Sequence, residues 1–331
     1  MPRTEFISTG HYVPERVVTN AELETYMDTS DEWIRERSGI EERRWAAEGQ
    51  GGAEMARIAT ERALEKAGMA AEEIDCIVLA TISPDYFFPG TGVYLQDKLG
   101  LREIPCLDVR NQCSGFLYGL EVADAFIKTG HYRKILLVGT EIHSTGLQVN
   151  DAGRDTAVLF GDGAGVAILG PTDDPDRGVL AVRTHADGKH AEKLWAPAPA
   201  CIRMPFISVE DIEKGLARPF MNGREVFRHA VTRMPESVNE VLDEAGLTID
   251  DVKLLIPHQA NLRISQMVQR KLGLSDDRVF NNIMRYGNTT AATIPIALSE
   301  ALEEGRFERG DVVAFTAFGS GFTWGGALIR W

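Results

Sequence analysis

Residues 104–130 read IPCLDVRNQCSGFLYGLEVADAFIKTG, and they predict a strand that turns into a helix around one cysteine. Apolar residues recur every three or four positions from Phe116 to Ile127, the spacing of an amphipathic helix, and Gly130 is a typical helix stop. Cys113 therefore stands at the helix start, where free N–H groups and the positive end of the dipole collect. That position lowers the pKa of a thiol, so Cys113 is a candidate nucleophile. The alternative is a buried, unreactive cysteine.

The composition is that of an ordinary globular protein. The chain has 331 residues, 44% of them hydrophobic and 25% charged, which is enough for two hydrophobic cores. No secretory signal, membrane-spanning run, disulfide pattern or metal-binding cysteine spacing is present, so a cytoplasmic protein is expected. The net charge of −14 argues against binding to nucleic acid or to an anionic membrane surface.

The sequence contains an internal repeat. Three segments of the first half recur in the same order in the second half at nearly one offset, which indicates a duplication. Each half alternates helices with apolar strands, as in α/β proteins with buried sheets. The expected halves are residues 1–175 and 176–331. The matched segments are 63–80 with 241–258, 95–101 with 268–274, and 129–134 with 304–309.

The repeat identifies further polar residues as candidates for a functional site. Cys113 aligns with Asn288, which also precedes a helical segment, and the strand end at Ala80 aligns with His258. Ligands in such sheets bind near strand ends, so Cys113, His258 and Asn288 are candidate catalytic residues. A capping role in the fold is the alternative for His258 and for Asn288.

One segment, 189–222, has no partner in the other half. It is rich in proline and apolar residues, and Ser208 to Asp211 predicts one short capped helix. Such an insertion is either a lid over an apolar pocket or part of a subunit interface, and the sequence leaves both open.

With these candidates in place, the chain resembles the β-ketoacyl-acyl-carrier-protein synthase III family of bacterial fatty-acid synthesis, within the thiolase-like superfamily. The combination of Cys-Ser-Gly, His-Gln-Ala-Asn and Gly-Asn-Thr elements is specific to that family. The likeness is carried by TSDEWIRERSGI (29–40), CSGF (113–116), RDTAVLFGDGAGVAIL (154–169), HADG (185–188), EVF (225–227), PHQANLRI (257–264), YGNTTAA (286–292) and AFGSGFTWGGALIRW (317–331).

The resemblance implies a fold and a catalytic centre. The fold would be thiolase-like α/β, with two duplicated halves in five layers, α-β-α-β-α. Cys113, His258 and Asn288 match the catalytic triad of the family, and the backbone N–H groups of Cys113 and Gly321 match its oxyanion hole. No metal or redox cofactor is implied, because coenzyme A thioesters are substrates.

The resemblance also implies binding residues and a homodimer. Trp33 matches the tryptophan that stacks on the adenine of coenzyme A, and Arg37 and Arg154 match residues at its nucleotide end. Phe88 matches a phenylalanine that bounds the primer pocket across the dimer, and Met204 and Phe206 of the insertion are candidates for the same acyl pocket. A basic patch for the acidic carrier protein would comprise Arg263, Arg270 and Lys271, with a merely solvated helix face as the alternative.

Three departures from the family pattern put the acyl substrate in doubt. Gly319-Ser320-Gly321 replaces three glycines, Arg224 stands where asparagine is usual, and the insertion is long. The glycine-rich run 161–165 does not predict a dinucleotide site, because a strand-like run rather than a helix follows it.

The sequence thus predicts an acyltransferase that condenses an acyl-coenzyme A primer with malonyl-acyl-carrier protein. The product is a β-ketoacyl-acyl-carrier protein, formed by decarboxylative Claisen condensation through an acyl-Cys113 intermediate. The alternative is a starter-unit or long-chain acyl-coenzyme A condensing enzyme of a specialised pathway. An inactive scaffold homologue is the non-enzyme alternative, and the intact triad argues against it.

Overall fold

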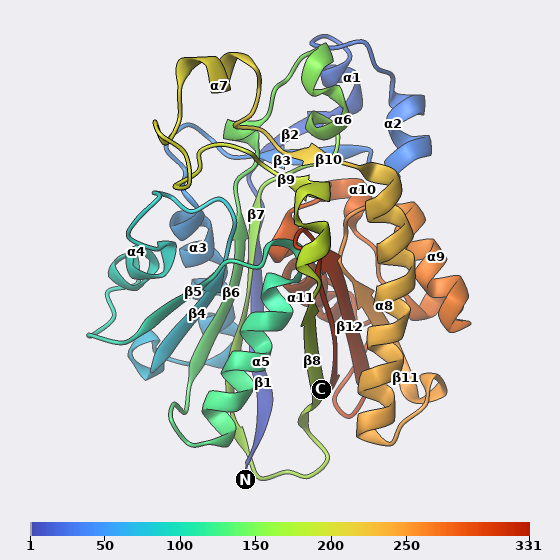
Figure 1. Ribbon diagram of the computed structural model, residues 1–331. Helices are drawn as coiled ribbons and strands as arrows, with labels where there is room; N and C mark the ends of the chain where they lie inside the picture. The colour runs from blue at the N-terminus through green and yellow to red at the C-terminus, as the bar shows by residue number, and fades with distance from the viewer. Residues whose placement is uncertain (1) are drawn as a thin grey trace.

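The computed structural model describes residues 2–331, which form five layers of alternating helices and sheets (Figure 1). Two β-sheets stand roughly side by side, with helices between them and further helices on both outer faces. The fold class predicted from the sequence is confirmed. No helix of the described residues combines the length and apolar character needed to cross a bilayer.

The first sheet has five strands in the order β1-β7-β6-β4-β5. Strand β7 is antiparallel to both β1 and β6, whereas β6, β4 and β5 are parallel to one another. Strands β4, β6 and most of β7 are buried, as expected from their continuous apolar runs. The bounds are Arg3–Tyr12 for β1, Cys76–Ala80 for β4, Cys106–Val109 for β5, Ile135–Glu141 for β6 and Gly163–Thr172 for β7.

The second sheet has four strands, which repeat four of the five strands of the first sheet. Its order β8-β13-β12-β11 matches β1-β7-β6-β4, with the same pattern of two antiparallel pairs and one parallel pair. The expected division after residue 175 falls in the turn between β7 and β8, and it stays a prediction. The bounds are Gly178–Ala186 for β8, Val252–Pro257 for β11, Val312–Gly319 for β12 and Thr323–Arg330 for β13.

The helices form three layers around these sheets. Helices α5 and α11 lie between the sheets, α3 and α4 cover the outer face of the first sheet, and α8 and α9 cover the second (Figure 1). The central layer holds the largest apolar core, which includes Phe116 and Phe315. The bounds are Gly52–Ala67 for α3, Thr91–Lys98 for α4, Gly115–Lys128 for α5, Gly223–Ala245 for α8, Leu262–Leu272 for α9 and Thr293–Glu303 for α11.

Shorter elements surround the top of the molecule in Figure 1. Two of them are small two-stranded sheets, β2 with β3 and β9 with β10. The bounds are Arg16–Thr19 for β2, Glu42–Trp45 for β3, Leu194–Trp195 for β9, Phe220–Met221 for β10, Asn20–Leu23 for α1, Asp31–Ser38 for α2, Arg154–Ala157 for α6, Val209–Glu213 for α7 and Ile283–Tyr286 for α10. The 3₁₀ turns used below are η2 at Gln112–Ser114, η5 at Gly188–Lys193 and η8 at Thr290–Ala292.

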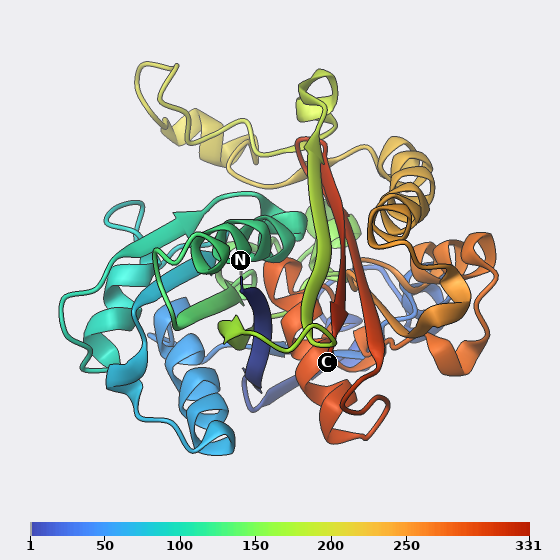
Figure 2. The ribbon, with the colours of Figure 1, turned by 90° about the horizontal axis from the view of Figure 1, so that it is seen from below.

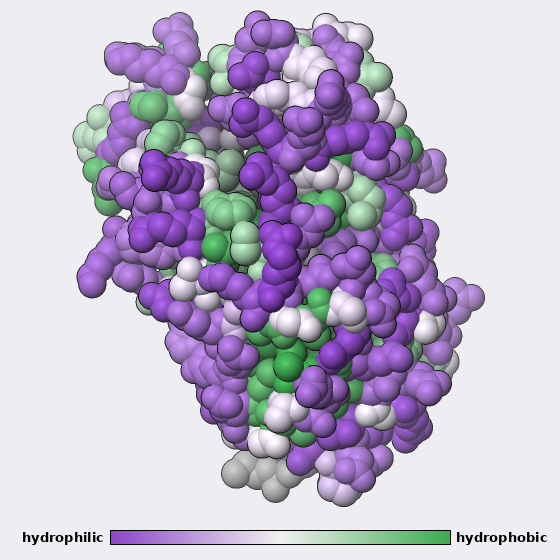
Figure 3. Space-filling model, turned by 90° about the vertical axis from the view of Figure 1, so that its right-hand side faces the viewer, coloured by the Kyte–Doolittle hydropathy of each residue, from purple (hydrophilic) through white to green (hydrophobic). Residues whose placement is uncertain are grey.

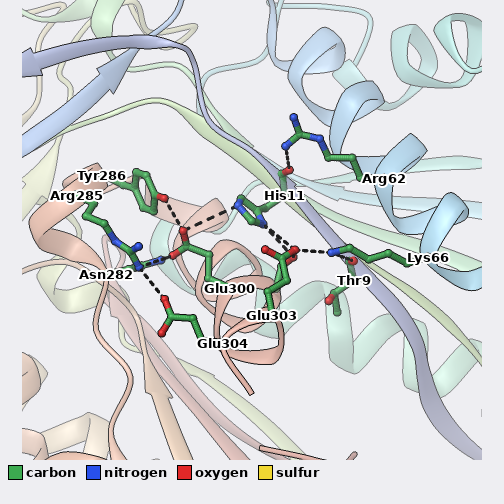
Figure 4. A network of polar contacts seen from close by, with 11 residues as sticks. Thr9, His11, Arg62, Lys66, Asn282, Arg285, Tyr286, Glu300, Glu303 and Glu304 are labelled. Carbon is green, nitrogen blue, oxygen red and sulfur yellow. Dashed lines mark hydrogen bonds and ion pairs between the residues drawn. The ribbon is translucent and has the colours of Figure 1, made fainter. Parts of the chain in front are cut away.

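A polar network joins the two halves (Figure 4). His11 of β1 accepts or donates a hydrogen bond with Ser299 of α11 at 2.9 Å, and Lys66 of α3 pairs with Glu303 at 2.5 Å. Glu300, a buried carboxyl of α11, accepts hydrogen bonds from Asn282 and from Arg285 at 2.7 and 3.1 Å. These contacts connect α11 of the second half with β1 and α3 of the first half.

The segment 189–222, which has no counterpart in the other half of the repeat, protrudes from the body of the molecule (Figure 2). The predicted short helix is present as α7, and Ser208 and Asp211 form the capping box expected from the sequence. The apolar residues of this segment are largely outside the core, with Ile202 97% exposed and Met204 fully exposed.

Candidate active site

Cys113 lies in the 3₁₀ turn η2, between strand β5 and helix α5. Gln112 before it has a φ of 42°, and only one other described non-glycine residue, Thr290, has a positive φ. A side chain at Gly319 would collide with the cysteine, since its Cβ would lie 2.6 Å from Cβ and 3.1 Å from Sγ of Cys113. The end of β12 therefore approaches Cys113 as closely as a backbone can, and only glycine fits there.

The thiol of Cys113 is not activated by its helix, and that sequence prediction is wrong. Burial and, to a lesser extent, the charge of Glu141 raise its pKa to about 12, and the N–H groups of Cys113 and Ser320 only partly oppose them. The helix proper begins two residues later, at Gly115, and burial disfavours the charged form of the thiol. Cys113 is a neutral thiol in the free protein, so its ionisation needs a proton acceptor.

His258 follows the end of β11 and is almost completely buried. Its backbone N–H donates to the carbonyl oxygen of Thr316 in β12 at 2.8 Å, which places the ring at the strand ends. Nδ1 lies 2.7 Å from Oγ1 of Thr293, whereas Nε2 has no hydrogen-bond partner among residues 2–331. Burial lowers the pKa of His258 to about 3, so the ring is neutral at physiological pH.

Asn288 lies in the segment that leads into η8 and α11. Its backbone N–H donates to the carbonyl oxygen of Leu159 at 2.8 Å, and its carbonyl oxygen accepts from Gly161 at 3.2 Å. The side-chain oxygen Oδ1 accepts from the N–H of Thr290 at 2.8 Å, in a turn that gives Thr290 its φ of 49°. This contact fixes the carboxamide and leaves its NH₂ group as the donor.

The structure brings the three segments of the predicted triad together. The turn η2 packs on η8 and on β12, and β12 is the neighbour of β11, which ends before His258. His258 follows strand β11, whereas Cys113 and Asn288 precede the central helices α5 and α11. Cys113 and Asn288 thus occupy equivalent positions, as their alignment in the internal repeat predicts. Strained backbone at Gln112 and Thr290, next to the triad residues, is typical of functional sites. The catalytic role of the three residues stays a prediction at this point.

The turn after β12 carries the predicted oxyanion donor Gly321. Gly321 has a φ of 135°, and a Cβ there would lie 2.8 Å from Cγ2 of Thr323, so glycine is required. Ser320, the departure from three glycines, donates its hydroxyl hydrogen to the carbonyl oxygen of Leu194. Ser114, next to the cysteine, donates to Thr323 Oγ1 at 2.7 Å. Ser320 thus ties the turn to β9.

The residues predicted to bind coenzyme A form one cluster on the surface. The guanidinium carbons of Arg37 and Arg154 lie 4.7 and 5.0 Å from the ring centroid of Trp33. A cavity of about 420 Å³ begins beside them and is lined by Arg37, Arg224 and Arg263 together with Gly223, Phe227 and Asn261. Arg224, the second departure, adds a third guanidinium to a pocket suited to phosphate groups.

The predicted carrier-protein patch lies on α9. Asn261 caps this helix, and Arg263, Arg270 and Lys271 are exposed and without an ion pair among the described residues. The face of the molecule that carries α8 and α9 is mainly hydrophilic, with one hydrophobic strip in its lower half (Figure 3). A charged partner therefore suits the α9 end of this face.

The predicted acyl-pocket residues lie on the surface of the single chain. Phe88 is 80% exposed and Met204 is fully exposed, whereas Phe206 packs edge to face on Phe87 with centroids 5.4 Å apart. These residues belong to an exposed apolar patch, defined here as Tyr86, Phe87, Phe88, Ile202, Met204 and Phe206. Their role at the acyl chain stays a prediction.

Family models and related proteins identify the family to which this chain belongs. The model described as 3-oxoacyl-[acyl-carrier-protein (ACP)] synthase III matches residues 107–188, and its C-terminal model matches residues 242–331. A β-ketoacyl-[acyl-carrier-protein] synthase III of Roseiflexus castenholzii is 47% identical over 97% of this chain and 96% of its own. The chain belongs to the β-ketoacyl-acyl-carrier-protein synthase III family. Like the other members of this synthase III family, it is a condensing acyltransferase.

Solved structures agree with the synthase III assignment. The 3-oxoacyl-[acyl-carrier-protein] synthase III of Aquifex aeolicus superposes with a TM-score of 0.91 at 42% identity, over 99% of this chain and all of its own. The priming β-ketosynthase of a polyketide pathway superposes with a TM-score of 0.89 at 32% identity, over 99% and 96% of the two chains.

Sequence reasoning missed three residues of this synthase III site. Thr293 contacts His258, Glu141 raises the pKa of Cys113, and Ser320 anchors the turn after β12 to Leu194. Thr293 and Glu141 lie in apolar runs without a distinctive local pattern. Ser320 was visible as a departure, but its hydrogen-bond partner is over a hundred positions away in the sequence.

Proposed function

We propose that the protein catalyses the decarboxylative Claisen condensation of an acyl-coenzyme A primer with malonyl-acyl-carrier protein, through an acyl-Cys113 intermediate. The observation that carries the proposal is the convergence of a thiol, a neutral imidazole and a fixed carboxamide at adjoining strand ends in a chain of this family. The product initiates fatty-acid synthesis, and the proposal includes a cytoplasmic location.

In the first half-reaction the neutral ring of His258 takes the thiol proton. As Sγ of Cys113 bonds to the primer carbonyl, the proton moves from Sγ to Nε2, the nitrogen without a protein partner. The carbon–sulfur bond to coenzyme A then breaks, and Nε2 gives the proton to the leaving sulfur. No net charge accumulates in the buried site, which matters because both the thiolate and the imidazolium are strongly disfavoured there.

In the second half-reaction malonyl-acyl-carrier protein loses carbon dioxide, and the two electrons of the broken bond form an enolate. The NH₂ group of Asn288 and Nε2–H of His258 donate to the thioester oxygen as negative charge develops there. Preorganised donors of this kind contribute roughly 3 kcal/mol each. The enolate carbon attacks the acyl-Cys113 carbonyl, whose oxygen is held by backbone N–H groups of the turns at Cys113 and Gly321. Cys113 leaves as a thiolate and takes up the proton that the overall reaction consumes.

Thr293 allows His258 to accept a proton in the first half-reaction and to donate a hydrogen bond in the second. Its hydroxyl has one hydrogen and two acceptors within reach, Nδ1 of His258 at 2.7 Å and the carbonyl oxygen of Thr290 at 2.9 Å. When the hydrogen goes to Thr290, Nδ1 carries a proton and Nε2 accepts, as primer loading requires. When it goes to Nδ1, Nε2 carries the proton and donates, as decarboxylation requires.

The binding residues follow from the same proposal. The adenine of coenzyme A would stack on Trp33 beside the two guanidinium groups, with its phosphates in the cavity lined by Arg37, Arg224 and Arg263. The carrier protein would dock on α9. The coenzyme A site and the carrier-protein docking site are both supported by positively charged side chains that face solvent.

We further propose that the protein is a homodimer. Strand β5 lies at the edge of the first sheet, and its Leu107 is 40% exposed, so the edge is open for pairing with a second copy. The exposed apolar patch belongs to the loop that follows β4, the neighbour of β5, and to the insertion. Monomeric proteins rarely expose so many large apolar side chains together.

The test is acylation of the intact protein by a series of acyl-coenzyme A thioesters of increasing length, followed by mass spectrometry. Wild type and Cys201→Ala should each gain one acyl group, and Cys113→Ala should gain none. Cys201 is the matched control because it is the exposed cysteine most open to adventitious reaction. Acylation of Cys113→Ala would overturn the assignment of the nucleophile. The preferred chain length separates a primary fatty-acid role from a starter-unit or long-chain role.

A further inference from the structure

His143 lies two residues beyond the end of β6, and no step of the proposed reaction uses it. Its side chain is only 13% exposed, and burial lowers its pKa to about 4, so the ring is neutral near neutral pH. Nε2 of His143 lies 2.5 Å from Oγ1 of Thr290, the first residue of η8. The other neighbour of the ring is Phe160, with ring centroids 4.6 Å apart. A buried polar ring that contacts the turn of Asn288 calls for an explanation.

Thr290 has an unusual backbone conformation. Its φ is 49°, in the left-handed region that β-branched residues rarely adopt. In this conformation the N–H of Thr290 donates to Oδ1 of Asn288 at 2.8 Å. A disfavoured conformation persists only where the surrounding structure holds it. Among residues 2–331 the one hydrogen-bond partner of the Thr290 hydroxyl is the ring of His143, so this contact is available to hold it.

The backbone of His143 is fixed independently of its ring. Asp162, a buried carboxyl just before β7, accepts from the N–H of His143 at 2.7 Å and from that of Ser144 at 3.0 Å. The same carboxyl accepts from the N–H of Ala46 after β3 at 2.7 Å. The loop after β6 is thus tied to two other segments, and it presents the imidazole to Thr290 as a fixed support. Removal of the imidazole leaves these backbone contacts in place.

We propose that His143 is a positioning residue that holds Thr290 in its left-handed conformation and thereby orients the carboxamide of Asn288 toward the enolate oxygen. The inference rests on the proposed role of Asn288 in decarboxylation and adds the residue that orients it. Because η8 holds the rest of Thr290, a relaxation of its φ turns the peptide plane that carries its N–H. Oδ1 of Asn288 then loses its donor, and the NH₂ group is no longer preorganised for the developing charge.

The experiment compares the release of carbon dioxide from malonyl-carrier protein with primer loading in the full-length protein. His143→Leu should lower kcat for this release by about tenfold, less than the effect of Asn288→Ala because the carboxamide is still present. KM for malonyl-carrier protein and primer loading should stay as in wild type, since the carboxamide contributes to neither. Thr290→Val removes the same contact from the other side and should behave like His143→Leu. Thr290→Ser keeps the hydroxyl and should keep the wild-type rate.

A double-mutant cycle separates positioning from a merely structural role. In the Asn288→Ala background the carboxamide is absent, so His143→Leu should lower the release of carbon dioxide by less than about twofold. A merely structural defect would lower it about tenfold in both backgrounds. The matched control is His11→Leu, which should keep the wild-type rate. His11 is 14% exposed, and its Nδ1 lies 2.9 Å from the hydroxyl oxygen of Ser299 in the network of Figure 4.

Three results overturn the inference. The first is a wild-type rate of carbon dioxide release in His143→Leu, and the second is a tenfold loss that persists in the Asn288→Ala background. The third needs no assay of activity: a crystal structure of His143→Leu in which Thr290 keeps its positive φ and its contact with Asn288. The same criteria apply to Thr290→Val, so the test does not depend on the folding of one variant. A turn that relaxes in these structures while wild type releases no carbon dioxide would contradict the proposed function and leave the positioning of Asn288 by His143 standing.

Discussion

Nδ1 of His258 lies 2.7 Å from the hydroxyl oxygen of Thr293, and this contact joins the end of β11 to the first residue of α11. The same hydroxyl lies 2.9 Å from the carbonyl oxygen of Thr290. The protonation site of a neutral imidazole is set by the partner of its other nitrogen. Thr293 therefore determines whether Nε2 accepts or donates in each half of the proposed reaction.

Thr293→Val should impair turnover by roughly tenfold to a hundredfold, the range expected when a positioned reacting group loses its geometry. Thr293→Ser keeps the hydroxyl and should retain most activity. Thr60→Val is the control for loss of a buried hydroxyl, because Thr60 donates to Ala56 within α3, far from the site. Steady-state rates with a saturating primer check this. Full activity of Thr293→Val would contradict the role of the contact.

His258→Ala and Asn288→Ala should each impair malonyl decarboxylation by about a hundredfold, since each removes a donor to the developing enolate oxygen. Their effects on primer loading should differ. Asn288→Ala should load normally, whereas His258→Ala loses the proton acceptor for a thiol with a pKa of about 12 and should load slowly. Release of carbon dioxide from malonyl-carrier protein and intact mass measure the two steps separately. Equal loading by both variants would remove His258 from the first half-reaction.

Charge reversal on α9 should separate the carrier protein from the primer. Arg270→Glu with Lys271→Glu should raise KM for malonyl-carrier protein and leave primer loading unchanged, because these side chains lie outside the cavity lined by Arg37. Arg263→Glu should weaken both steps, because Arg263 lines that cavity as well.

The control for these reversals is Arg133→Glu with Arg309→Glu, which changes the net charge equally at exposed positions elsewhere. KM for malonyl-carrier protein in the wild type should rise with salt, since exposed charges are screened beyond about 10 Å at 0.1 M ionic strength. A KM that does not depend on salt would contradict the docking assignment.

The exposed apolar patch should be buried in a dimer. Phe88→Glu with Met204→Glu should shift the protein from dimer to monomer in sedimentation velocity, because a carboxylate at such a position would be buried without a partner. Val17→Glu, at an exposed apolar residue of β2 outside the patch, should leave the dimer intact. Monomeric wild-type protein would overturn the assignment, and a dimeric double variant would place the interface elsewhere.

The elements and the family were determined by the sequence itself. The spacing of apolar residues located α5, and Gly68 and Gly246 marked equivalent helix ends in the two halves, where both adopt a left-handed conformation. The capping box at Ser208 was equally readable. Such signals depend on contacts between residues a few positions apart, so a linear pattern contains them.

The chemistry of the nucleophile was decided only by the tertiary structure. The helix start predicted a lowered pKa for Cys113, but burial of the thiol raises its pKa to about 12. Thr293 became visible as the partner of His258 only when α11 packed beside the end of β11. Desolvation and charge interactions depend on residues brought together from distant parts of the chain, and the local pattern around one cysteine contains no record of them.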